Sequence, residues 1–507
     1  MKLSNFLLYF LPLFIIISPS HASRATPPSP STSKIRAVNL GGWLVTEGWI
    51  KPSLFDGIPN GDFLDGTQLQ LKSVTQNKYL CAESGGGTII VANRSSASGW
   101  ETFKLWRITE NTFQFRVFNG QFMGLDGGGT DVVAVSDSSD PSETFEIIRN
   151  ANDSSRVRIK APNGSFLQAK TDVLVTADYG ESTNWGNDDP SVFLINIVGK
   201  MQGEFQITNG YGTEKATPVL REHWNSFIVE EDFNFISQNG LNAVRIPVGW
   251  WTAINPTPWP FVEGSLQILD RAFSWAEKYD LKVIIDLHAA PGSQNGYEHS
   301  ASRDGSQEWG TNDTIAQTIT VIDFLTNRYA KSPSFLAMEL LNEPRAPGAT
   351  LDTLKKYYQD AYNTVRKYTI DAYVIMCNRL SASPTELLQF ASGLQGSVVD
   401  VHYYNLYTSN FNGLNVQQNI DYLNNNRSAE LSTVDSSNGS PLVLVGEWVA
   451  EWEVNDATKE DYQRFAAAEL NVFGRASFGW AYWTLKNVQN HWSLEWMITN
   501  GYIKITS

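Results

Sequence analysis

The chain has 507 residues, which is long enough for two or three domains with at least one large hydrophobic core. It carries 53 acidic against 38 basic side chains, a formal charge of −15, and no basic run, so nucleic acids and anionic membranes are excluded as expected partners. Its 17 tryptophans are a heavy aromatic load, which is typical of binding clefts and of large cores alike.

The first 22 residues are predicted to be a secretory signal peptide. Lys2 supplies the positive end, residues 6–17 are apolar, and small residues follow up to a cleavage point after Ala22 or Ser23. The apolar run is too short to span a bilayer comfortably, and the last residues, NGYIKITS, carry neither a retention signal nor an anchor tail. We therefore expect a secreted protein of the extracellular space or cell wall, with a Pro/Ser linker over residues 23–34.

Export predicts N-glycosylation, and six N-x-S/T sequons agree with it. They lie at Asn93, Asn152, Asn163, Asn312, Asn426 and Asn438. The two cysteines, Cys81 and Cys377, are expected in different domains, so a disulfide between them is not favoured. The fold is therefore expected to depend on its core rather than on covalent bridges.

Residues 62–198 alternate apolar and polar side chains between Gly, Ser and Asn turns, which indicates an all-β domain. Tyr79, Phe122 and Phe166, each followed by Leu or Met, recur 43 and 44 positions apart. Each repeat begins with an alternating strand and closes with another, FKLWRI, FEIIR or FLINIV. Three repeats of four short strands predict a β-trefoil that resembles the fascin-like and ricin-type trefoils, although the third copy lacks the Gly-Gly-Gly turn.

Residues 35–61 and 199–507 alternate apolar strand-like runs with amphipathic helices. The runs are IRAVNLG, LNAVRIPV, LKVIIDLHA, FLAMELLNEP, AYVIMCNRL, GSVVDVHYY, PLVLVGEWV and FGWAYWTLK. Strands that are apolar on both faces and alternate with helices imply a parallel sheet, and eight of them predict a (β/α)8 TIM barrel, an α/β fold. The trefoil then interrupts the barrel after its first strand, on the face where barrel active sites form.

Polar residues end these predicted strands. They are Arg245, His288, Asn342, Glu343, His402, Tyr404, Glu447 and Trp483. Glu343 ends strand four and Glu447 ends strand seven, and strands three apart in a closed ring of eight face each other across its centre. Two opposed carboxyls about 5–5.5 Å apart are what retaining glycoside hydrolysis requires.

The neighbours of the two carboxyls predict unequal roles. A nucleophile must stay ionised, which a nearby Arg245 and the Tyr404 hydroxyl would favour. An acid must keep its proton, and burial beside a second carboxylate raises its pKa. Pro344 is expected to hold Glu343 in an extended backbone, and Asn342 is expected to bind a sugar 2-hydroxyl.

Seven motifs in this order resemble glycoside hydrolase family 5 of clan A, and most of all its exo-β-1,3-glucanase branch: VNLGGWL, NAVRIPVGWW, DLHAAPGSQNG, LLNEP, DVHYY, VGEW and GWAYWTLK. The resemblance covers Arg36 to about Phe55 and Glu214 to nearly the end. It implies Glu343 as acid/base and Glu447 as nucleophile. It also implies a supporting shell of Arg245, His288, Asn342, His402, Tyr404 and Trp483, with Glu47 in the terminal sugar subsite.

Two features depart from the yeast-like members of that branch. Relatives often carry phenylalanine where this chain has Tyr297 and Tyr407, at the entrance where the next sugar unit would stack. Tyrosine keeps the stacking face but adds a hydroxyl, which leaves the linkage preference open. The inserted trefoil is the second departure and resembles the plant members.

The sequence thus predicts a retaining hydrolase of β-1,3-glucan or related β-glucosides that acts as a monomer without metal or organic cofactor. Hydrolysis or transglycosylation of another β-glycan, such as β-1,4-mannan, is the alternative within enzymes. An inert cell-wall carbohydrate-binding protein is the alternative of another class, and the intact carboxylate pair argues against it. Glycan contact by the trefoil stays open, because Trp100, Trp106 and Trp185 could be sugar platforms or core residues.

Overall fold

The computed structural model describes residues 34–435 and 441–505. The predicted signal peptide, the linker up to residue 33 and the sequon at Asn438 lie outside the described residues. Among the helices that are described, none is long and apolar enough to cross a membrane.

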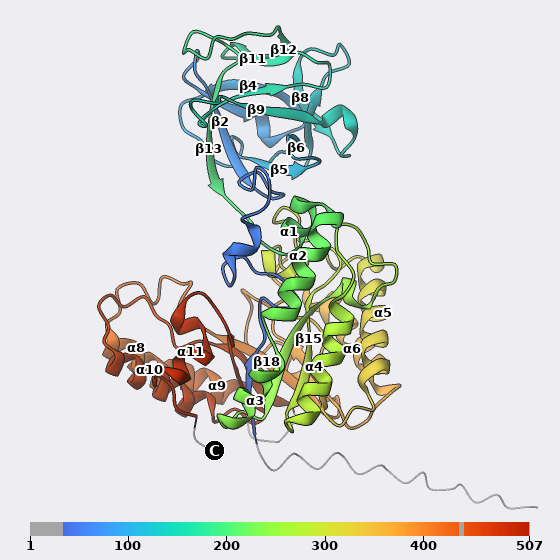
Figure 1. Ribbon diagram of the computed structural model, residues 1–507, viewed down its shortest axis with the longest axis vertical. Coiled ribbons are helices and arrows are strands. Elements are labelled where there is room, and N and C mark those ends of the chain that lie inside the picture. The colour runs from blue at the N-terminus through green and yellow to red at the C-terminus, as the bar shows by residue number, and fades with distance from the viewer. Residues whose placement is uncertain (1–33, 436–440, 506–507) are drawn as a thin grey trace, which may run out of the picture.

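A closed barrel of parallel strands forms the larger part of the molecule (Figure 1). Its strands are β1 (Ile35–Asn39), β14 (Ala243–Gly249), β15 (Lys282–Ala289), β16 (Phe335–Glu339), β17 (Tyr373–Cys377), β18 (Ser397–Tyr403), β19 (Leu442–Trp448) and β20 (Gly479–Tyr482). They pair in chain order, and β20 pairs back with β1, so the ring closes. The predicted TIM barrel is confirmed, and each of the predicted apolar runs supplies one of its strands.

Helices cover the outside of the barrel because their apolar sides pack on the buried strands. They are α1 (Glu204–Tyr211), α2 (Thr213–Ser226), α3 (Glu230–Gln238), α4 (Ser265–Lys278), α5 (Asn312–Tyr329), α6 (Leu351–Arg366), α7 (Leu388–Ala391), α8 (Val416–Tyr422), α9 (Ser428–Val434), α10 (Lys459–Phe473) and α11 (Leu494–Thr499). In α4, for example, Leu269, Ala272 and Phe273 are buried at the spacing of one helical face. The α5 helix begins where the Thr311 hydroxyl accepts a hydrogen bond from the backbone N–H of Thr314.

A second, all-β unit is inserted between β1 and β14. Its strands are β2 (Gln68–Ser73), β3 (Tyr79–Ala82), β4 (Thr88–Arg94), β5 (Phe103–Arg107), β6 (Thr112–Arg116), β7 (Phe122–Leu125), β8 (Val132–Ser136), β9 (Phe145–Arg149), β10 (Arg156–Lys160), β11 (Phe166–Thr171), β12 (Leu174–Tyr179) and β13 (Phe193–Gly199). The first and last strands of the sequence repeats pair in the ring β2–β5–β6–β9–β10–β13–β2. The middle strands form the hairpins β3–β4, β7–β8 and β11–β12. We call this unit the β-rich domain.

The core of the β-rich domain is built from aromatic rings. Phe103, Phe115 and Phe145 are fully buried and meet edge to face, with ring centroids 6.3 and 5.8 Å apart. Edge-to-face pairs of this kind add stabilisation beyond the buried apolar area. Cys81 lies in this domain and Cys377 in the barrel, and both are buried free thiols.

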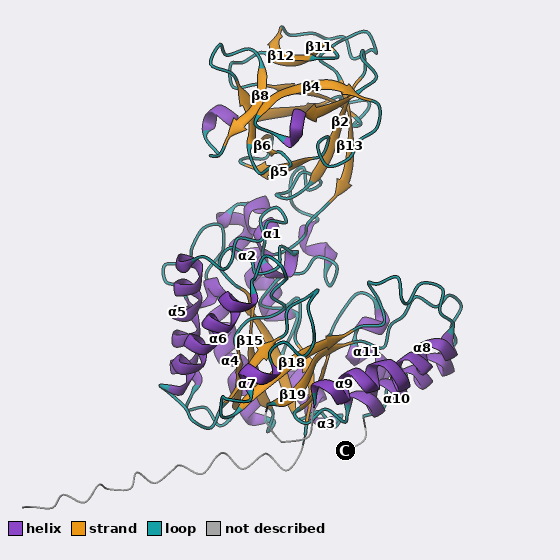
Figure 2. Ribbon diagram, turned by 180° about the vertical axis from the view of Figure 1, so that it is seen from behind, coloured by secondary structure: helices purple, strands orange, loops and turns teal. Residues whose placement is uncertain are grey.

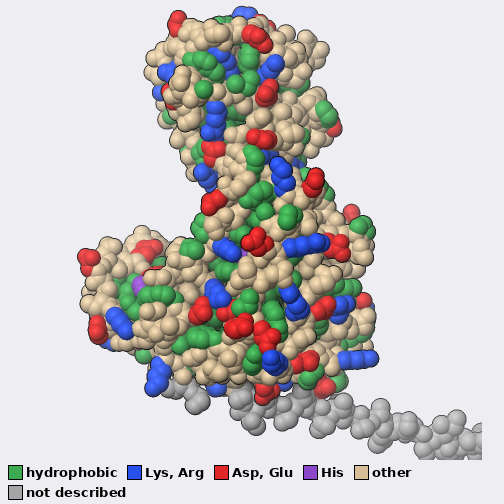
Figure 3. Space-filling model, in the orientation of Figure 1, with side chains coloured by type: hydrophobic (Ala, Val, Ile, Leu, Met, Phe, Trp, Pro, Cys, Tyr) green, Lys and Arg blue, Asp and Glu red, His purple; other side chains and the backbone are tan. Residues whose placement is uncertain are grey.

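The β-rich domain stands at one end of the barrel, next to α1 and α2 (Figures 1 and 2). Helices α8 to α11 form a lobe at the side of the barrel. Acidic and basic side chains are interspersed over the face seen in Figure 3, without a large area of one sign. The chain passes from the barrel into the β-rich domain after β1 and returns to the barrel after β13. Both connecting segments lie near the loops that follow the barrel strands.

Candidate active site

The predicted site residues gather at the carboxyl end of the barrel, with one correction. His402 and Glu447 lie near the ends of β18 and β19, and Glu343 follows β16. The prediction that strand two ends at Arg245 is wrong, because this residue is the third of the seven in β14. The strand continues to Gly249, and Arg245 reaches the other side chains from inside the barrel.

Arg245 is fully buried and joins four strands of the barrel. It donates from Nε and Nη2 to the two oxygens of Glu339, at 2.7 and 2.8 Å. Its Nη1 donates to Glu447 Oε1 at 3.1 Å and to Asn39 Oδ1 at 2.9 Å. Its Nη2 also donates to Asn342 Oδ1 at 2.9 Å. One planar guanidinium therefore fixes the orientation of these four side chains at once.

Glu343 and Glu447 meet at one histidine. His402 Nδ1 lies 2.7 Å from Glu343 Oε1 and 3.5 Å from Glu447 Oε2. One oxygen of each carboxylate and the imidazole nitrogen all lie within 4.8 Å of one another. The Tyr404 hydroxyl donates to Glu447 Oε2 at 2.7 Å. The two carboxyls of the sequence prediction are thus neighbours, each held by its own partners.

The protons of this cluster are shared, and the direction of one predicted shift is wrong. Burial lowers the pKa of His402, but the charges of Glu447 and Asp400 raise it well above its ordinary value. Burial raises the pKa of Glu343, yet the hydrogen bond and charge of His402 lower it to about 2. The expected raised pKa of Glu343 is therefore not found, because the hydrogen bond and the charge of His402 outweigh the effect of burial. Burial raises the pKa of Glu447, and the charge of His402 offsets this only in part.

The backbone at Glu343 also differs from the prediction. Its φ is +45°, in the left-handed region, whereas Pro344 was expected to keep it extended. The conformation is held from both sides, since the Glu343 N–H donates to Cys377 Sγ at 3.4 Å and its carbonyl accepts from Asn295 Nδ2 at 3.1 Å. A non-glycine residue in this region costs on the order of 1–3 kcal/mol, and such strain concentrates at functional sites.

His288 links the carboxylate cluster to Trp483. Its Nδ1 lies 2.6 Å from Asp286 Oδ2, and its Nε2 lies 3.5 Å from Asn342 Nδ2. The carboxylate favours a proton on Nδ1, which leaves Nε2 as an acceptor. The imidazole ring stacks on Trp483 at a centroid distance of 5.4 Å and an interplanar angle of 9°. His288 therefore orients both the amide of Asn342 and the indole beside the site.

Glu47 is buried near the two carboxylates and is only half satisfied. Trp49 Nε1 donates to its Oε2 at 3.0 Å, whereas its Oε1 has no hydrogen-bond partner among the described residues. Burial raises its pKa well above the ordinary value, and the charges of Glu447 and Glu343 add to this effect. A buried oxygen without a partner at this place is suited to accept a ligand hydroxyl.

Tyr297 and Tyr407 are the exposed aromatic residues beside the cluster. Their exposed fractions are 41% and 74%. The ring of Tyr297 lies 5.5 Å from that of His299, and the ring of Tyr407 lies 5.7 Å from that of Tyr404. Each tyrosine thus adjoins a residue that contacts one of the two carboxylates.

Sequence reasoning missed the acids behind the two histidines. Asp286 precedes His288 by two residues, and Asp400 precedes His402 by two, so each pair lies on one face of its strand. Asp400 Oδ2 lies 3.1 Å from His402 Nε2 and thereby orients the imidazole toward Glu343. The repeated D-x-H pattern of DLH and DVH could have revealed both acids.

Two residues of the loop after β15 were also missed. His299 Nε2 lies 3.4 Å from Glu343 Oε2 and 2.9 Å from Asn295 Nδ2. Burial lowers the pKa of His299 to about 4, so this imidazole is neutral and accepts the amide hydrogen bond. Apart from the PGSQNG motif, no spacing in the sequence marks this loop position as a neighbour of Glu343.

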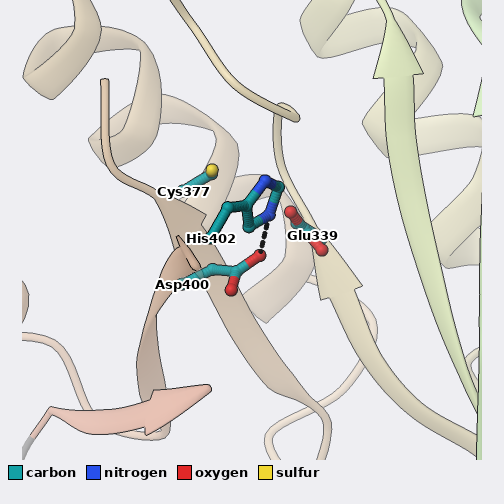
Figure 4. Close-up of side chains that lie close together, drawn as sticks. All are labelled: Glu339, Cys377, Asp400 and His402. Carbon is teal, nitrogen blue, oxygen red and sulfur yellow. Dashed lines mark hydrogen bonds and ion pairs between the residues drawn. The ribbon is translucent and has the colours of Figure 1, made fainter. Parts of the chain in front are cut away.

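Within residues 34–435 and 441–505, two groups of side chains have the donor atoms for a metal ion. One comprises Glu339, Cys377, Asp400 and His402 (Figure 4), and the other comprises Glu343, His402 and Glu447. In the first group, Glu339 is held by Arg245 and Asp400 by His402, so positive charge already compensates the carboxylates. The expectation of a metal-free site stays a prediction.

Comparison with known families divides the chain in two. Residues 207–489 match Cellulase (glycosyl hydrolase family 5), which is more than half of the chain. Residues 60–198 match a domain of unknown function (DUF7910). The β-rich domain therefore has no assigned role.

Individual relatives agree with the family match. A probable glucan 1,3-beta-glucosidase A of Emericella nidulans is 32% identical over 59% of this chain and 82% of the relative. Glucan 1,3-beta-glucosidase 1 of Schizosaccharomyces pombe is 33% identical over 54% of this chain and 72% of the relative. The crystal structure of a rutinosidase from Aspergillus niger superposes with a TM-score of 0.52 at 23% identity, over 59% of this chain and 88% of that one, which shows a shared fold. The chain belongs to glycosyl hydrolase family 5.

Proposed function

We propose that this glycosyl hydrolase cleaves β-1,3-linked glucan or related β-glucosides with retention, using Glu343 as acid/base and Glu447 as nucleophile. The observation that carries the proposal is the separation of the carboxylates, which have oxygens within 4.8 Å of each other. Retaining enzymes place the two carboxyl groups about 5–5.5 Å apart, whereas inverting enzymes need about 6.5–9.5 Å to admit a water molecule.

In the first step, Glu447 attacks the anomeric carbon while the glycosidic bond breaks. The leaving oxygen takes a proton from Glu343, which draws it from His402 through their 2.7 Å hydrogen bond. Formation of the glycosyl ester removes the charge of Glu447, which is the main charge that raises the pKa of His402. The neutral imidazole is therefore stabilised as the ester forms, and the proton transfer and the bond exchange support each other.

In the second step, Glu343 acts as base. It takes a proton from a water molecule, whose oxygen attacks the anomeric carbon and releases Glu447 as a carboxylate. The restored charge of Glu447 raises the pKa of His402 again, so the proton returns from Glu343 to the imidazole. The cycle thus ends with the proton back on His402, from which Glu343 draws it in the next first step.

The supporting residues bind and orient the sugar. Arg245 and Tyr404 donate hydrogen bonds to Glu447 and hold its attacking geometry. Asn342 binds the 2-hydroxyl, an interaction that strengthens in the oxocarbenium-like transition state. The unpartnered oxygen of Glu47 accepts another sugar hydroxyl, and Trp483 supplies an apolar face.

The substrate assignment is supported by relatives named as glucan 1,3-beta-glucosidases. The alternative within enzymes is another β-glycan. Rates of hydrolysis of laminari-oligosaccharides and manno-oligosaccharides separate the two, and faster hydrolysis of the manno series would overturn the assignment.

The nucleophile is tested by covalent labelling. Incubation with an activated 2-fluoro glucoside should trap the glycosyl ester, and peptide mapping should find it on Glu447. A label on another residue, or no label on an enzyme that turns over β-glucan, would contradict the mechanism.

The acid/base is tested with Glu343→Ala. General acid catalysis contributes about 10²–10⁴-fold, so hydrolysis of β-glucan should fall by that factor while a glucoside with a good leaving group still forms the ester rapidly. Equal retention of activity on both substrates would show that Glu343 is not the acid.

We also propose that the β-rich domain is a β-trefoil and that the chain is exported. The closed six-strand ring with three hairpins supports the trefoil. The asparagines of the sequons at Asn152, Asn312 and Asn426 are exposed, which supports glycosylation there. Asn163 is less suited, because its Nδ2 donates to the carbonyls of residues 129 and 177. Mass spectrometry of the secreted protein with and without deglycosylation tests both export and the occupied sites.

A further inference from the structure

We propose that the β-rich domain braces the loop between β15 and α5 (residues 290–311) and thereby positions the groups around the acid/base Glu343. This inference rests on the proposed function, because it assumes that Glu343 is the proton donor. It gives a role to the β-rich domain, which matches a domain of unknown function. The bracing residues act through the loop and are positioning residues rather than catalytic ones.

The brace is centred on Asp304. Its carboxylate is almost fully buried, and its Oδ2 accepts from Trp106 Nε1 at 2.7 Å and from Arg116 Nη1 at 2.8 Å. Trp106 lies in β5 and Arg116 in β6, so both donors belong to the β-rich domain. Arg116 Nη1 also donates to Ser306 Oγ at 2.8 Å. A buried carboxylate with two donors from another domain is a strong and directional link.

Arg303 makes the reciprocal link from the loop to the β-rich domain. Its Nε donates to Asp65 Oδ1 at 2.7 Å, and its guanidinium lies over the ring of Trp106, 3.8 Å from the ring centre. Asp65 is fully buried and also accepts from Asn209 Nδ2 at 2.6 Å, which anchors it to α1 of the barrel. The backbone at Gly66 packs so closely on residues 303 and 304 that a Cβ there would lie 3.0 Å from the Arg303 carbonyl oxygen.

The braced part of the loop is packed against the part that reaches the active site. A Cβ at Gly296 would lie 2.7 Å from the carbonyl oxygen of Gly305, so the two arms of the loop touch through their backbones. Gly296 lies between Asn295 and Tyr297, and Gly305 follows Asp304. A shift of the part of the loop around Asp304 therefore displaces the part around Asn295, because their backbones touch with no flexible side chain between them.

The part of the loop around Asn295 and His299 forms the surroundings of Glu343. Asn295 Nδ2 donates to the Glu343 carbonyl at 3.1 Å and lies 2.9 Å from His299 Nε2. His299 in turn lies 3.4 Å from Glu343 Oε2. Tyr297, between them in sequence, is exposed. The loop thus supports the left-handed backbone of Glu343 and packs beside its carboxylate, and the β-rich domain supports the loop.

The test uses the full chain with Arg116→Ala and the matched control Arg94→Ala. Arg94 pairs with Glu83 at 2.9 Å inside the β-rich domain and makes no contact with the loop among the described residues. Arg116→Ala should raise hydrogen exchange in the peptides of residues 290–311, whereas Arg94→Ala should leave it unchanged. Arg116→Lys keeps a donor for Asp304 and should restore part of the protection.

The catalytic readout is the dependence on leaving group. On β-glucan, whose leaving group needs the acid, Arg116→Ala should lower kcat by roughly tenfold, which is a fraction of the ~10²–10⁴-fold that a general acid supplies. On a dinitrophenyl β-glucoside, whose leaving group needs no acid, it should lower kcat by less than twofold. Unchanged exchange in the loop, or an equal loss of kcat on both substrates, would overturn the brace. If Glu343→Ala itself leaves the leaving-group dependence unchanged, the proposed function fails instead, and the exchange experiment still decides whether the brace exists.

Discussion

The barrel and the β-rich domain bury charge in different ways. In the β-rich domain, Arg158 faces one carboxylate, Asp189, at 3.1 Å, and the two charges cancel. In the barrel, the single guanidinium of Arg245 lies within 4.0 Å of four carboxylates, at 3.2, 2.7, 3.9 and 3.1 Å. The four are Asp286, Glu339, Asp400 and Glu447. A cluster with more acids than bases must share protons, whereas a matched pair need not.

This difference indicates where chemistry can occur. The Asp189 carboxylate accepts from Ser191 and Ser182 as well as from Arg158, and those bonds lower its pKa against the effect of burial. Its charge is fixed, which suits a structural pair. Around Arg245, burial raises the pKa of Glu339 well above its ordinary value and raises that of Glu447 too. Proton affinity there responds to small changes in charge, which the proposed double displacement requires.

The largest expected effect comes from removing the central guanidinium. Arg245→Leu removes the guanidinium that lies within 4.0 Å of four buried carboxylates, so we expect the free energy of unfolding of the barrel to fall by about 3–5 kcal/mol and hydrolysis to be lost. Glu339 and Glu447, whose pKa values burial already raises, then bind protons more tightly when folded than when unfolded. The deficit in stability should therefore be small near about pH 4 and grow as pH rises above their unfolded pKa values. Calorimetric unfolding at several pH values measures it.

The matched control is Arg158→Leu. Asp189 keeps three hydrogen bonds from serine donors, so the loss should be nearer 1–3 kcal/mol, about the desolvation penalty of one under-satisfied polar group, with activity retained. Equal losses of stability for the two variants, or equal dependence on pH, would show that the barrel and the β-rich domain hold buried charge in the same way.

The barrel and the repeats were predictable because their signals are local. The strand runs are apolar on both faces, and the repeat of 43 and 44 residues marks the β-rich domain. Arg245 was misplaced because a polar residue inside a barrel strand looks like a strand end. His299 and the pKa of Glu343 were missed for another reason: both depend on contacts between a loop and distant strands, 44 and 59 positions apart for Glu343 with His299 and His402.

A smaller effect is expected from removing the imidazole of His402, which holds the resting proton in the proposed mechanism. In His402→Gln, burial is no longer opposed by an imidazolium, so the pKa of Glu343 should rise above its ordinary value. Glu343, the proposed acid, then loses its proton at the pKa of a buried carboxyl instead of the strongly raised pKa of His402. The alkaline limb of kcat/KM should move to lower pH by about one unit or more. An unchanged alkaline limb would mean that His402 does not hold the proton.

The smallest expected effect concerns the exposed aromatic pair of the β-rich domain, Trp100 and Phe118, with exposed fractions of 39% and 68%. Both rings flank Gly85, where a Cβ would lie 3.0 and 3.1 Å from them. If this pair contacts glycan, Trp100→Ala should weaken binding of the full chain to insoluble β-glucan by about two- to tenfold, the worth of one aromatic contact. Hydrolysis of a small soluble glucoside should stay unchanged, because the pair makes no contact with residues 290–311 that the structure records.

Trp185, whose ring centre lies 4.2 Å from the Arg158 guanidinium, is the control position, and Trp185→Phe should not alter binding. If Trp100→Ala leaves binding unchanged, this pair does not contact glycan, and bracing of the loop is the role of the β-rich domain that remains. If Trp100→Ala also lowers hydrolysis of the soluble glucoside, the β-rich domain and the barrel are more closely coupled than their buried charges suggest.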